Sequence, residues 1–285
     1  MAELTSNNPL QKYFRQPKLY INLPSKGQFY PQDAIEYPEN GEIPVFAMTA
    51  KDEITLKTPD ALLNGQATVE VIQSCIPAIK NAWEMPSIDL DACLIAIRMA
   101  TYGENLDLDI KVPNTGEDRT ISVNLQHLMT KLSQVEYNNV VYINDMTIIL
   151  KPLTYKIFTQ QSMRTFEEQR ILQLVNNQDI SNEEKLTAFN KSFRTLTDIT
   201  VGMVSNCIAK IIVESTEVSD PNHIDDFINN ADKNFYNSII DHLDEEKKKF
   251  TIEPVTVQSS EEDIEAGAPE SFEVPITLDA THFFA

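Results

Sequence analysis

Glycine is scarce in this chain, and the few glycines are widely spaced. Only seven occur among 285 residues, whereas an average protein contains about 7% glycine. No two of them lie within ten residues of each other, so the sequence contains no GxGxxG turn, no phosphate-binding loop and no GxSxG nucleophile elbow. This absence argues against most nucleotide-binding and hydrolase functions.

Cysteine and histidine, the residues that ligate transition metals most often, are also few. The three cysteines are Cys75, Cys93 and Cys207. They form no closely spaced pair, which argues against a disulfide framework and against a cysteine-based metal site. None of the four histidines has a partner at the spacing of a metal-binding motif. His242, close to Asp241 and Asp244, could bind a metal weakly, but a solvated histidine on an acidic helix is the favoured interpretation.

Three other groups of residues admit both a chemical and a structural interpretation. Asp107 and Asp109 have the composition of a carboxylate dyad, but they flank a leucine in an alternating pattern and mark the exposed face of a strand. The acidic run 261–263 could hold calcium, yet it lacks the DxDxDG order of ligands and is better interpreted as a flexible loop. Trp83 and Tyr102 could stack on a ligand or simply belong to the core or its rim. The sequence therefore predicts no catalytic, cofactor-binding or metal-ligating residue, no cofactor and no enzymatic activity.

Basic residues are outnumbered almost two to one, because 23 lysines and arginines stand against 43 aspartates and glutamates, for a net charge of −20. Such a surface repels nucleic acid and anionic lipid, since affinity for phosphate depends on basic groups. The imbalance is uneven: residues 1–31 carry a net charge of +3, whereas residues 251–285 contain eight acids and no base. The basic segment could bind its own acidic body or acidic neighbours in an assembly, and solvated faces are the alternative.

Long hydrophobic runs are missing as well. The longest candidate, residues 92–100, is interrupted by Arg98 and is far shorter than the ~20 residues that cross a bilayer. The first residues lack the basic-then-apolar order of a signal peptide. We therefore expect a soluble protein made in a cytoplasm, with no stable membrane insertion.

Residues 87–102 form the clearest predicted helix. Ser87 can cap its start, and Gly103 follows its end, where a left-handed residue is common. Apolar residues cover nearly its whole circumference, so we expect it to be buried in the centre of a domain. Before it, an extended arm with a turn at residues 24–27 is held by aromatic side chains rather than by regular structure, and a strand follows at residues 43–46. Shorter helices are predicted over residues 49–58, 60–64, 68–76 and 126–134.

Alternating apolar residues predict two β-hairpins in the middle of the chain. The first pairs residues 106–112 with 121–125, and the second pairs 140–143 with 146–150 across Asn144-Asp145. Helices are then predicted over residues 155–175, 181–213 and 220–249. The last 35 residues return to strands, at residues 250–257 and 272–278, around an acidic loop at 259–268.

The helix predicted over residues 181–213 opens with a capping box at Ser181 and carries an apolar stripe. The stripe steps by three and four residues with one gap at Thr200, and its members are Leu186, Phe189, Phe193, Leu196, Met203, Cys207 and Ile211. This spacing is typical of a coiled-coil seam with a partner helix. Burial in the core of the chain itself is the favoured interpretation.

Together these patterns predict an α+β fold with a helical core around one buried central helix, flanking β-hairpins, an extended N-terminal arm and a β-rich C-terminal tail. We expect the arm to span residues 1–40, the α+β core domain residues 41–250 and the acidic tail residues 251–285.

The order of several short segments resembles a viral family. The segments are Leu23-Pro-Ser-Lys-Gly27 with Phe29-Tyr-Pro31, Met48-Thr-Ala-Lys-Asp-Glu53, Lys57-Thr-Pro-Asp-Ala-Leu-Leu-Asn-Gly65, and residues 89–103 ending in Thr101-Tyr-Gly-Glu104. They resemble the baseplate hub and hub-assembly proteins of T-even-type contractile-tailed bacteriophages, firmly over residues 19–125 and loosely over the rest. The segment Ile276-Thr-Leu-Asp-Ala-Thr-His-Phe-Phe-Ala285 is also similar to this family.

The sequence departs from some members of that family at one hairpin tip. Those relatives carry a Cys-Pro-x-Cys pair after the Tyr-Gly-Glu motif, whereas this chain reads Val112-Pro-Asn-Thr115. Without the two thiolates a tetrahedral zinc site cannot be completed. We therefore expect ordinary strand pairing to hold this hairpin, and no bound zinc.

The resemblance implies a structural or assembly subunit of the central hub of a phage tail baseplate, which acts by protein–protein interaction and offers no catalytic residues. The expected partners are other baseplate hub or tail proteins, with self-association as a further prospect and no nucleic acid. The expected locations are the host cytoplasm during assembly and the virion tail baseplate. The alternatives are an assembly chaperone that is absent from the mature virion, and a metal- or small-molecule-dependent enzyme, which would need a polar pocket.

Overall fold

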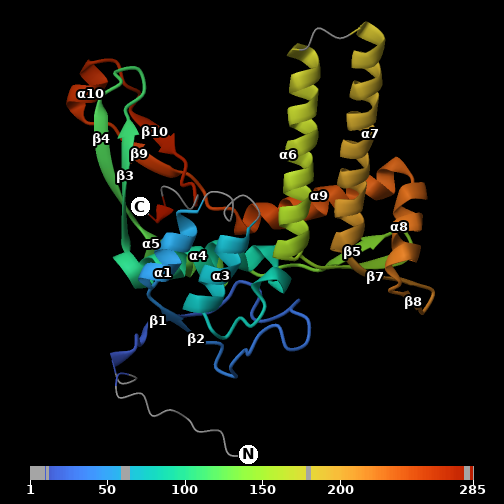
Figure 1. Ribbon diagram of the computed structural model, residues 1–285, viewed down its shortest axis with the longest axis horizontal. Coiled ribbons are helices and arrows are strands. Elements are labelled where there is room, and N and C mark those ends of the chain that lie inside the picture. The colour runs from blue at the N-terminus through green and yellow to red at the C-terminus, as the bar shows by residue number, and fades with distance from the viewer. Residues whose placement is uncertain (1–9, 11–12, 59–64, 178–180, 279–282, 285) are drawn as a thin grey trace, which may run out of the picture.

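The computed structural model describes residues 10, 13–58, 65–177, 181–278, 283 and 284. It confirms the α+β class, because helices alternate with strands that form four small antiparallel sheets within these residues. Two projections rise from a common base in Figure 1: the hairpin of helices α6 (Tyr155–Asn177) and α7 (Asn182–Cys207), and the ribbon of strands β3 (Asn105–Lys111) and β4 (Asp118–Asn124).

The central helix α4 (Leu90–Tyr102) lies in the larger hydrophobic core. Every residue from Ala92 to Ala100 is buried, which confirms the predicted burial on all sides. The predicted cap is wrong: Ser87 belongs to a 3₁₀ turn, η3 (Ser87–Asp89), and makes no capping bond. Gly103 has a φ of 98° but a ψ of 179°, so it lies outside the left-handed helical region. A positive φ with this ψ is open mainly to glycine, because a side chain would clash with the backbone.

The N-terminal segment is more regular than predicted. Its strand β1 (Pro17–Ile21) pairs with β2 (Ile43–Phe46), so the expectation that regular structure is missing from the arm is wrong. The following turn is fixed to the start of α4 by Asp89. This carboxylate accepts hydrogen bonds from the Ser25 backbone N–H (2.7 Å), the Ser25 hydroxyl (2.6 Å) and the Tyr30 hydroxyl (2.9 Å).

The short helices next to β2 follow the prediction. They are α1 (Ala50–Leu56) and α3 (Gln66–Cys75), and a 3₁₀ turn that was not predicted, η2 (Ala82–Glu84), follows them. The Thr49 hydroxyl and the Asp52 carboxylate form a capping box at the start of α1. Arg15 crosses between α1 and α3, where it donates to the Ser74 carbonyl and hydroxyl and pairs with Asp52 at 3.4 Å. The helix predicted over residues 60–64 lies outside the described residues.

The β3–β4 ribbon confirms the first predicted hairpin, and helix α5 (Leu125–Gln134) follows it directly. Beside the ribbon lie the elements of the tail, β9 (Val255–Gln258), α10 (Glu261–Glu265) and β10 (Ser271–Val274). The predicted acidic loop thus contains a helix, which begins with a capping box between Ser260 and Asp263. Asp263 also pairs with Arg119 of β4, so the tail is attached to the ribbon.

A smaller second core lies on a four-stranded sheet in the order β5, β6, β7, β8. Its strands are β5 (Val140–Ile143), β6 (Met146–Leu150), β7 (Ile208–Val213) and β8 (Thr216–Val218). The β5–β6 pair confirms the second predicted hairpin. The prediction that α7 continues to residue 213 is wrong, because residues 208–213 form β7 and pair with β6, with Ile211 opposite Ile148.

Two helices, α8 (Pro221–Asn230) and α9 (Lys233–Phe250), replace the single helix predicted over residues 220–249. Asp232 separates them, because its carboxylate accepts hydrogen bonds from the backbone N–H groups of Asn234 and Phe235 and caps a new helix. Since α9 extends to residue 250, the strand predicted from that residue begins only at Val255.

The division of the chain at residues 40 and 250 stays a prediction. The buried residues form two clusters. The larger one contains α4, Ile21 from β1, and Phe283 and Phe284 near the C-terminus. The smaller one takes its residues from the four-stranded sheet, the end of α7, α8 and α9.

Candidate interaction surface

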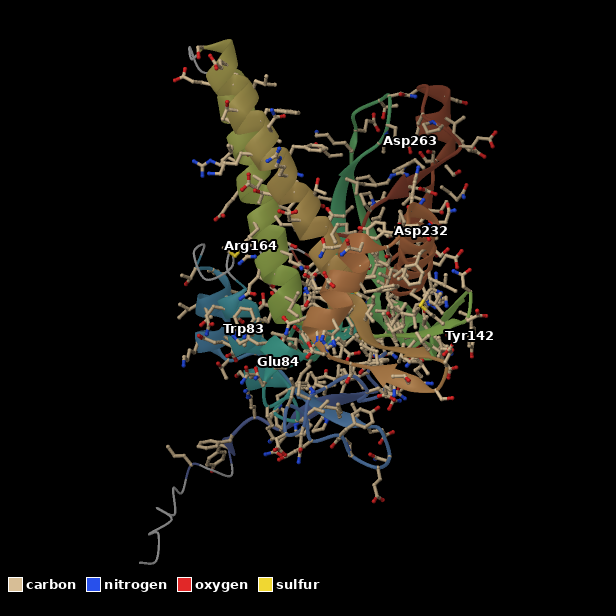
Figure 2. All side chains as sticks on the ribbon, turned by 90° about the vertical axis from the view of Figure 1, so that its right-hand side faces the viewer. Trp83, Glu84, Tyr142, Arg164, Asp232 and Asp263 are labelled. Carbon is tan, nitrogen blue, oxygen red and sulfur yellow. The ribbon has the colours of Figure 1, made fainter. Side chains whose placement is uncertain are left out.

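The upper turns of the α6–α7 hairpin stand clear of the rest of the protein (Figures 1 and 2). The hairpin buries few side chains completely. Ser192 of α7 is buried, and small residues (Ala188, Thr195) and large apolar ones (Leu172, Leu196, Ile199) are half-buried. The Gln161 Oε1 atom is buried without a hydrogen-bond partner, which opposes the association of the two helices.

Several large apolar side chains of the hairpin remain exposed. Leu186, Phe189 and Phe193 on α7 are 61%, 49% and 60% exposed, and Phe158 and Phe166 on α6 are 43% and 64% exposed. We call these five residues the apolar track. The prediction that the stripe of α7 is buried in the core of the chain is wrong for this outer half, because within the described residues no other element reaches it. Near its end α7 enters the smaller core through Val204, and Cys207 is also buried.

Helical geometry places the track on one side of the hairpin. Phe189 and Phe193 are one turn apart on α7, and their rings stack with centroids 6.3 Å apart. On α6, Phe166 follows Phe158 by eight residues, which is a rotation of about 80° around the helix axis. Phe158 lines the same cavity as Met203 of the α7 stripe. Phe158 therefore links the exposed residues of α7 to those of α6 at the base of the hairpin. Met163 and Ile171 of α6 are also exposed but lie on other sides of that helix.

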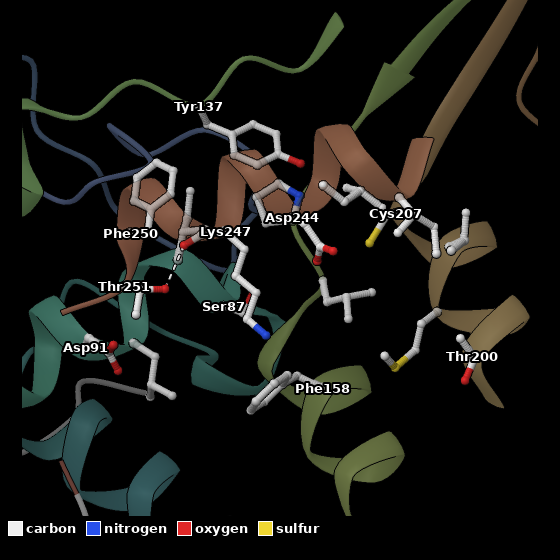
Figure 3. A pocket seen from close by; sticks show the side chains of 18 residues that line it. Ser87, Asp91, Tyr137, Phe158, Thr200, Cys207, Asp244, Lys247, Phe250 and Thr251 are labelled. Atoms are coloured by element: carbon white, nitrogen blue, oxygen red, sulfur yellow. Dashed lines mark hydrogen bonds between the residues drawn. The ribbon is translucent and has the colours of Figure 1, made fainter. Parts of the chain in front are cut away.

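That cavity lies at the base of the hairpin and has a volume of about 400 Å³. It is enclosed by the start of α4, the first turn of α6, the last turns of α7 and one face of α9 (Figure 3). Its wall is mostly apolar and includes Phe158, Met203, Cys207, Leu243 and Phe250. The apolar surface of α7 therefore continues from the exposed track into a hollow.

A few charged groups lie at the edge of the hollow. Asp91, Asp244 and Lys247 are among the lining residues and are labelled in Figure 3. Partial burial raises the pKa of Asp91 to about 6. The cavity contains neither a paired acid and base nor a nucleophile next to a base, so its geometry suits an apolar side chain better than a reacting substrate.

The histidine and acidic candidates from the sequence have structural roles. His242 is half-buried rather than solvated, contrary to the prediction, and its Nε2 lies 2.8 Å from the Asn138 carbonyl oxygen. The neighbouring Glu246 is buried and accepts hydrogen bonds from the Asn138 N–H (2.9 Å) and the Lys249 ammonium. Within the described residues no group of three or more metal-ligating side chains comes together, and His282 lies outside those residues.

The remaining candidates are also separated from one another. Trp83 stacks on Tyr155 with ring centroids 5.7 Å apart, and the Tyr102 hydroxyl donates to the Phe284 carbonyl at 3.3 Å. Asp107 and Asp109 lie on the exposed face of β3, as predicted. At the tip of the ribbon, the Asn114 amide donates to the Gly267 carbonyl of the tail at 3.1 Å. The absence of catalytic, cofactor-binding and metal-ligating residues stays a prediction.

The sequence thus predicts the part of the candidate site on α7 but not the part on α6. The heptad spacing of the α7 stripe is visible there, but it does not say which partner covers the stripe. A further signal is the second stripe of small and polar residues on α7, at Ala188, Ser192 and Thr195, which are buried or half-buried in the hairpin. Phe158 and Phe166 on α6 follow no regular stripe.

Exposed apolar surfaces of this kind are common where another protein binds. The chain matches the family model of the T4 bacteriophage base plate protein over residues 16–272, from the start of β1 to β10. The chain belongs to this family. No curated protein and no solved structure matches it.

Membership in the T4 baseplate family makes this chain a structural protein of the phage tail baseplate, with other baseplate or tail proteins as its partners. The matched range includes the whole α6–α7 hairpin, so the apolar track lies on a part of the chain that the family model covers. Within the described residues, no helix is both long enough and apolar enough to span a membrane.

Proposed function

We propose that this baseplate protein is a subunit of the central hub of the tail baseplate and that it acts by joining protein subunits. The observation that carries the proposal is the apolar track, which is exposed along a helical hairpin that stands clear of both cores. A soluble protein rarely leaves a contiguous apolar patch of this size uncovered unless a partner binds it. The resemblance of residues 19–125 to hub and hub-assembly proteins supports the position in the hub.

The experiment uses a phage whose copy of this gene carries an early stop codon, complemented by plasmid-borne variants. Purified virions and tail intermediates are digested, and the peptides of this protein are quantified by mass spectrometry. A hub subunit is expected in mature tails at a fixed ratio to the other hub proteins. A protein that is present in intermediates but missing from virions would instead be an assembly chaperone, which would overturn the proposal of a permanent subunit.

The variant Phe193→Gln tests the role of the track in assembly. Its matched control is Ile54→Gln, which changes a residue of α1 that is 68% exposed and lies away from the track. We expect Phe193→Gln to reduce complementation and Ile54→Gln to complement fully, because only the first removes apolar contact area from the track. Equal complementation by both variants would contradict the proposed role of the track.

A further inference from the structure

The α6–α7 hairpin differs from the rest of the chain in its charge. Residues 155–207 contain six basic and six acidic residues, so the hairpin is neutral and the remainder of the chain carries the whole net charge of −20. Two copies of a protein this acidic repel each other over most of their surfaces. The hairpin is a long surface on which a second copy meets apolar side chains without net repulsion.

The stripe of α7 is also self-complementary. Its positions 186, 189, 193, 196, 200 and 203 alternate steps of three and four, which are the a and d positions of a heptad. When two such stripes are placed antiparallel about an axis between residues 194 and 195, each a position faces a d position. Leu186 of one copy then faces Met203 of the other, and Phe193 faces Leu196. A two-fold axis makes both ends of the contact identical.

The antiparallel placement joins the exposed track to the cavity. Leu186 is the fifth residue of α7, near the tip of the hairpin, and Met203 lines the cavity at its base. The two positions are 17 residues apart, which corresponds to about 26 Å along a helix. A second hairpin in the opposite direction therefore brings its Leu186 to the mouth of the cavity, where an apolar side chain fills an apolar hollow.

The area of the track fits such a contact. Its five members each leave about half of a large side chain exposed, which amounts to on the order of 500 Å² of apolar surface per copy at ~150–250 Å² for each aromatic side chain. Flanking side chains and the cavity wall add to this value. The total approaches the ~800 Å² per partner that is typical of a stable interface.

We propose that two copies of this chain pair through their α6–α7 hairpins as an antiparallel four-helix bundle, in which Leu186 of each copy enters the cavity of the other. This pairing goes beyond a place in the hub, because it concerns the isolated protein and is measured without any other baseplate component.

The first experiment measures the mass of the full-length protein in solution by sedimentation velocity over a range of concentrations. The intact chain is expected to dimerise, and added salt should not weaken the dimer because the interface is apolar and neutral. Leu186→Gln and Phe193→Gln are each expected to raise the dimer dissociation constant by about tenfold or more. The control Ile54→Gln is expected to leave it unchanged. These substitutions change exposed side chains, so circular dichroism should show an unaltered fold.

The second experiment tests the direction of pairing. One preparation carries Phe189→Cys, another carries Thr200→Cys, and the two are mixed and treated with a short bismaleimide, since the native cysteines are buried. The antiparallel pairing places residue 189 opposite residue 200 and predicts a mixed cross-linked dimer. A 189–189 product in its place would overturn the antiparallel arrangement.

The outcomes separate this inference from the proposed function. A monomer at all concentrations, or a dimer that Leu186→Gln and Phe193→Gln leave intact, would overturn the pairing. A monomer that nevertheless binds another baseplate protein through the track would overturn the pairing and leave the hub proposal standing. If the protein dimerises as proposed but is missing from virions, the pairing stands and the proposal of a permanent hub subunit is overturned.

Discussion

Asp89 tests how the N-terminal segment is fixed to the central helix. Its carboxylate is fully buried and accepts hydrogen bonds from Ser25 and Tyr30. Burial outweighs these bonds and raises the pKa of Asp89 from 3.8 to about 6. The folded protein therefore binds this proton more tightly than the unfolded chain does, so the contribution of Asp89 to stability is greatest below pH 3.8 and is lost as the pH rises to about 6. The difference in pKa corresponds to ~3 kcal/mol.

The perturbation is Asp89→Asn, which stays neutral at every pH. The asparagine oxygen can still accept from the Ser25 N–H, and its NH₂ group can donate to the hydroxyls of Ser25 and Tyr30. We expect the free energy of unfolding of the variant to increase relative to that of the intact protein by up to ~3 kcal/mol between about pH 4 and pH 7. Urea unfolding followed by circular dichroism across this range measures the difference.

A constant offset between the two proteins would report only the altered hydrogen bonds, so the pH-dependent part is the test. Asp107→Asn, at an exposed position in β3, is the control that makes the same chemical change outside the core. The reasoning is refuted if the difference between Asp89→Asn and the intact protein stays the same from about pH 4 to pH 7.

Three further substitutions test other parts of the fold. Ile95→Asp places an unpaired charge at a fully buried position of α4 and should cost several kcal/mol, so a soluble variant with an unchanged melting temperature would contradict the burial of this helix. Arg15→Ala removes the hydrogen bonds to Ser74 and should lower stability by ~1–3 kcal/mol, measured by calorimetry; no change would mean that this contact does not stabilise the fold. Arg119→Ala removes the ion pair with Asp263 and should speed amide hydrogen exchange in α10, and unchanged exchange would argue against attachment of the tail through this pair.

The local structure of this chain could be predicted wherever the signal lies within a few residues. The capping box at Ser181 marks a true helix start, and the alternation in β3 and β4 fixes their pairing. The apolar circumference of α4 indicates its burial because no other environment suits a helix with that composition. These features depend on neighbouring residues alone, so the sequence displays them directly.

The errors arise where distant segments decide the outcome. Residues 208–213 continue the helical spacing of α7. They form a strand instead because they pair with β6, which lies about 60 residues earlier in the chain and which the local pattern does not reveal. The strand β1 is likewise determined by β2. The apolar stripe of α7 gives the same spacing whether it is covered by its own chain or by another protein. The outer half of the stripe is exposed because the α6–α7 hairpin extends beyond the other elements of the fold, which the three-dimensional arrangement shows and the spacing does not (Figure 1).

Phe283 and Phe284 bear on the order in which the chain folds during synthesis. The Phe283 ring lies 5.6 Å from the guanidinium carbon of Arg98, and the Phe284 carbonyl accepts a hydrogen bond from Tyr102. The end of α4 therefore stays uncovered until residue 284 has left the ribosome, whereas the smaller core needs only residues between 143 and 239. Because contacts between distant residues form slowly, we expect the smaller core to fold first. The helix at the centre of the molecule is then among the last segments to be sealed from water.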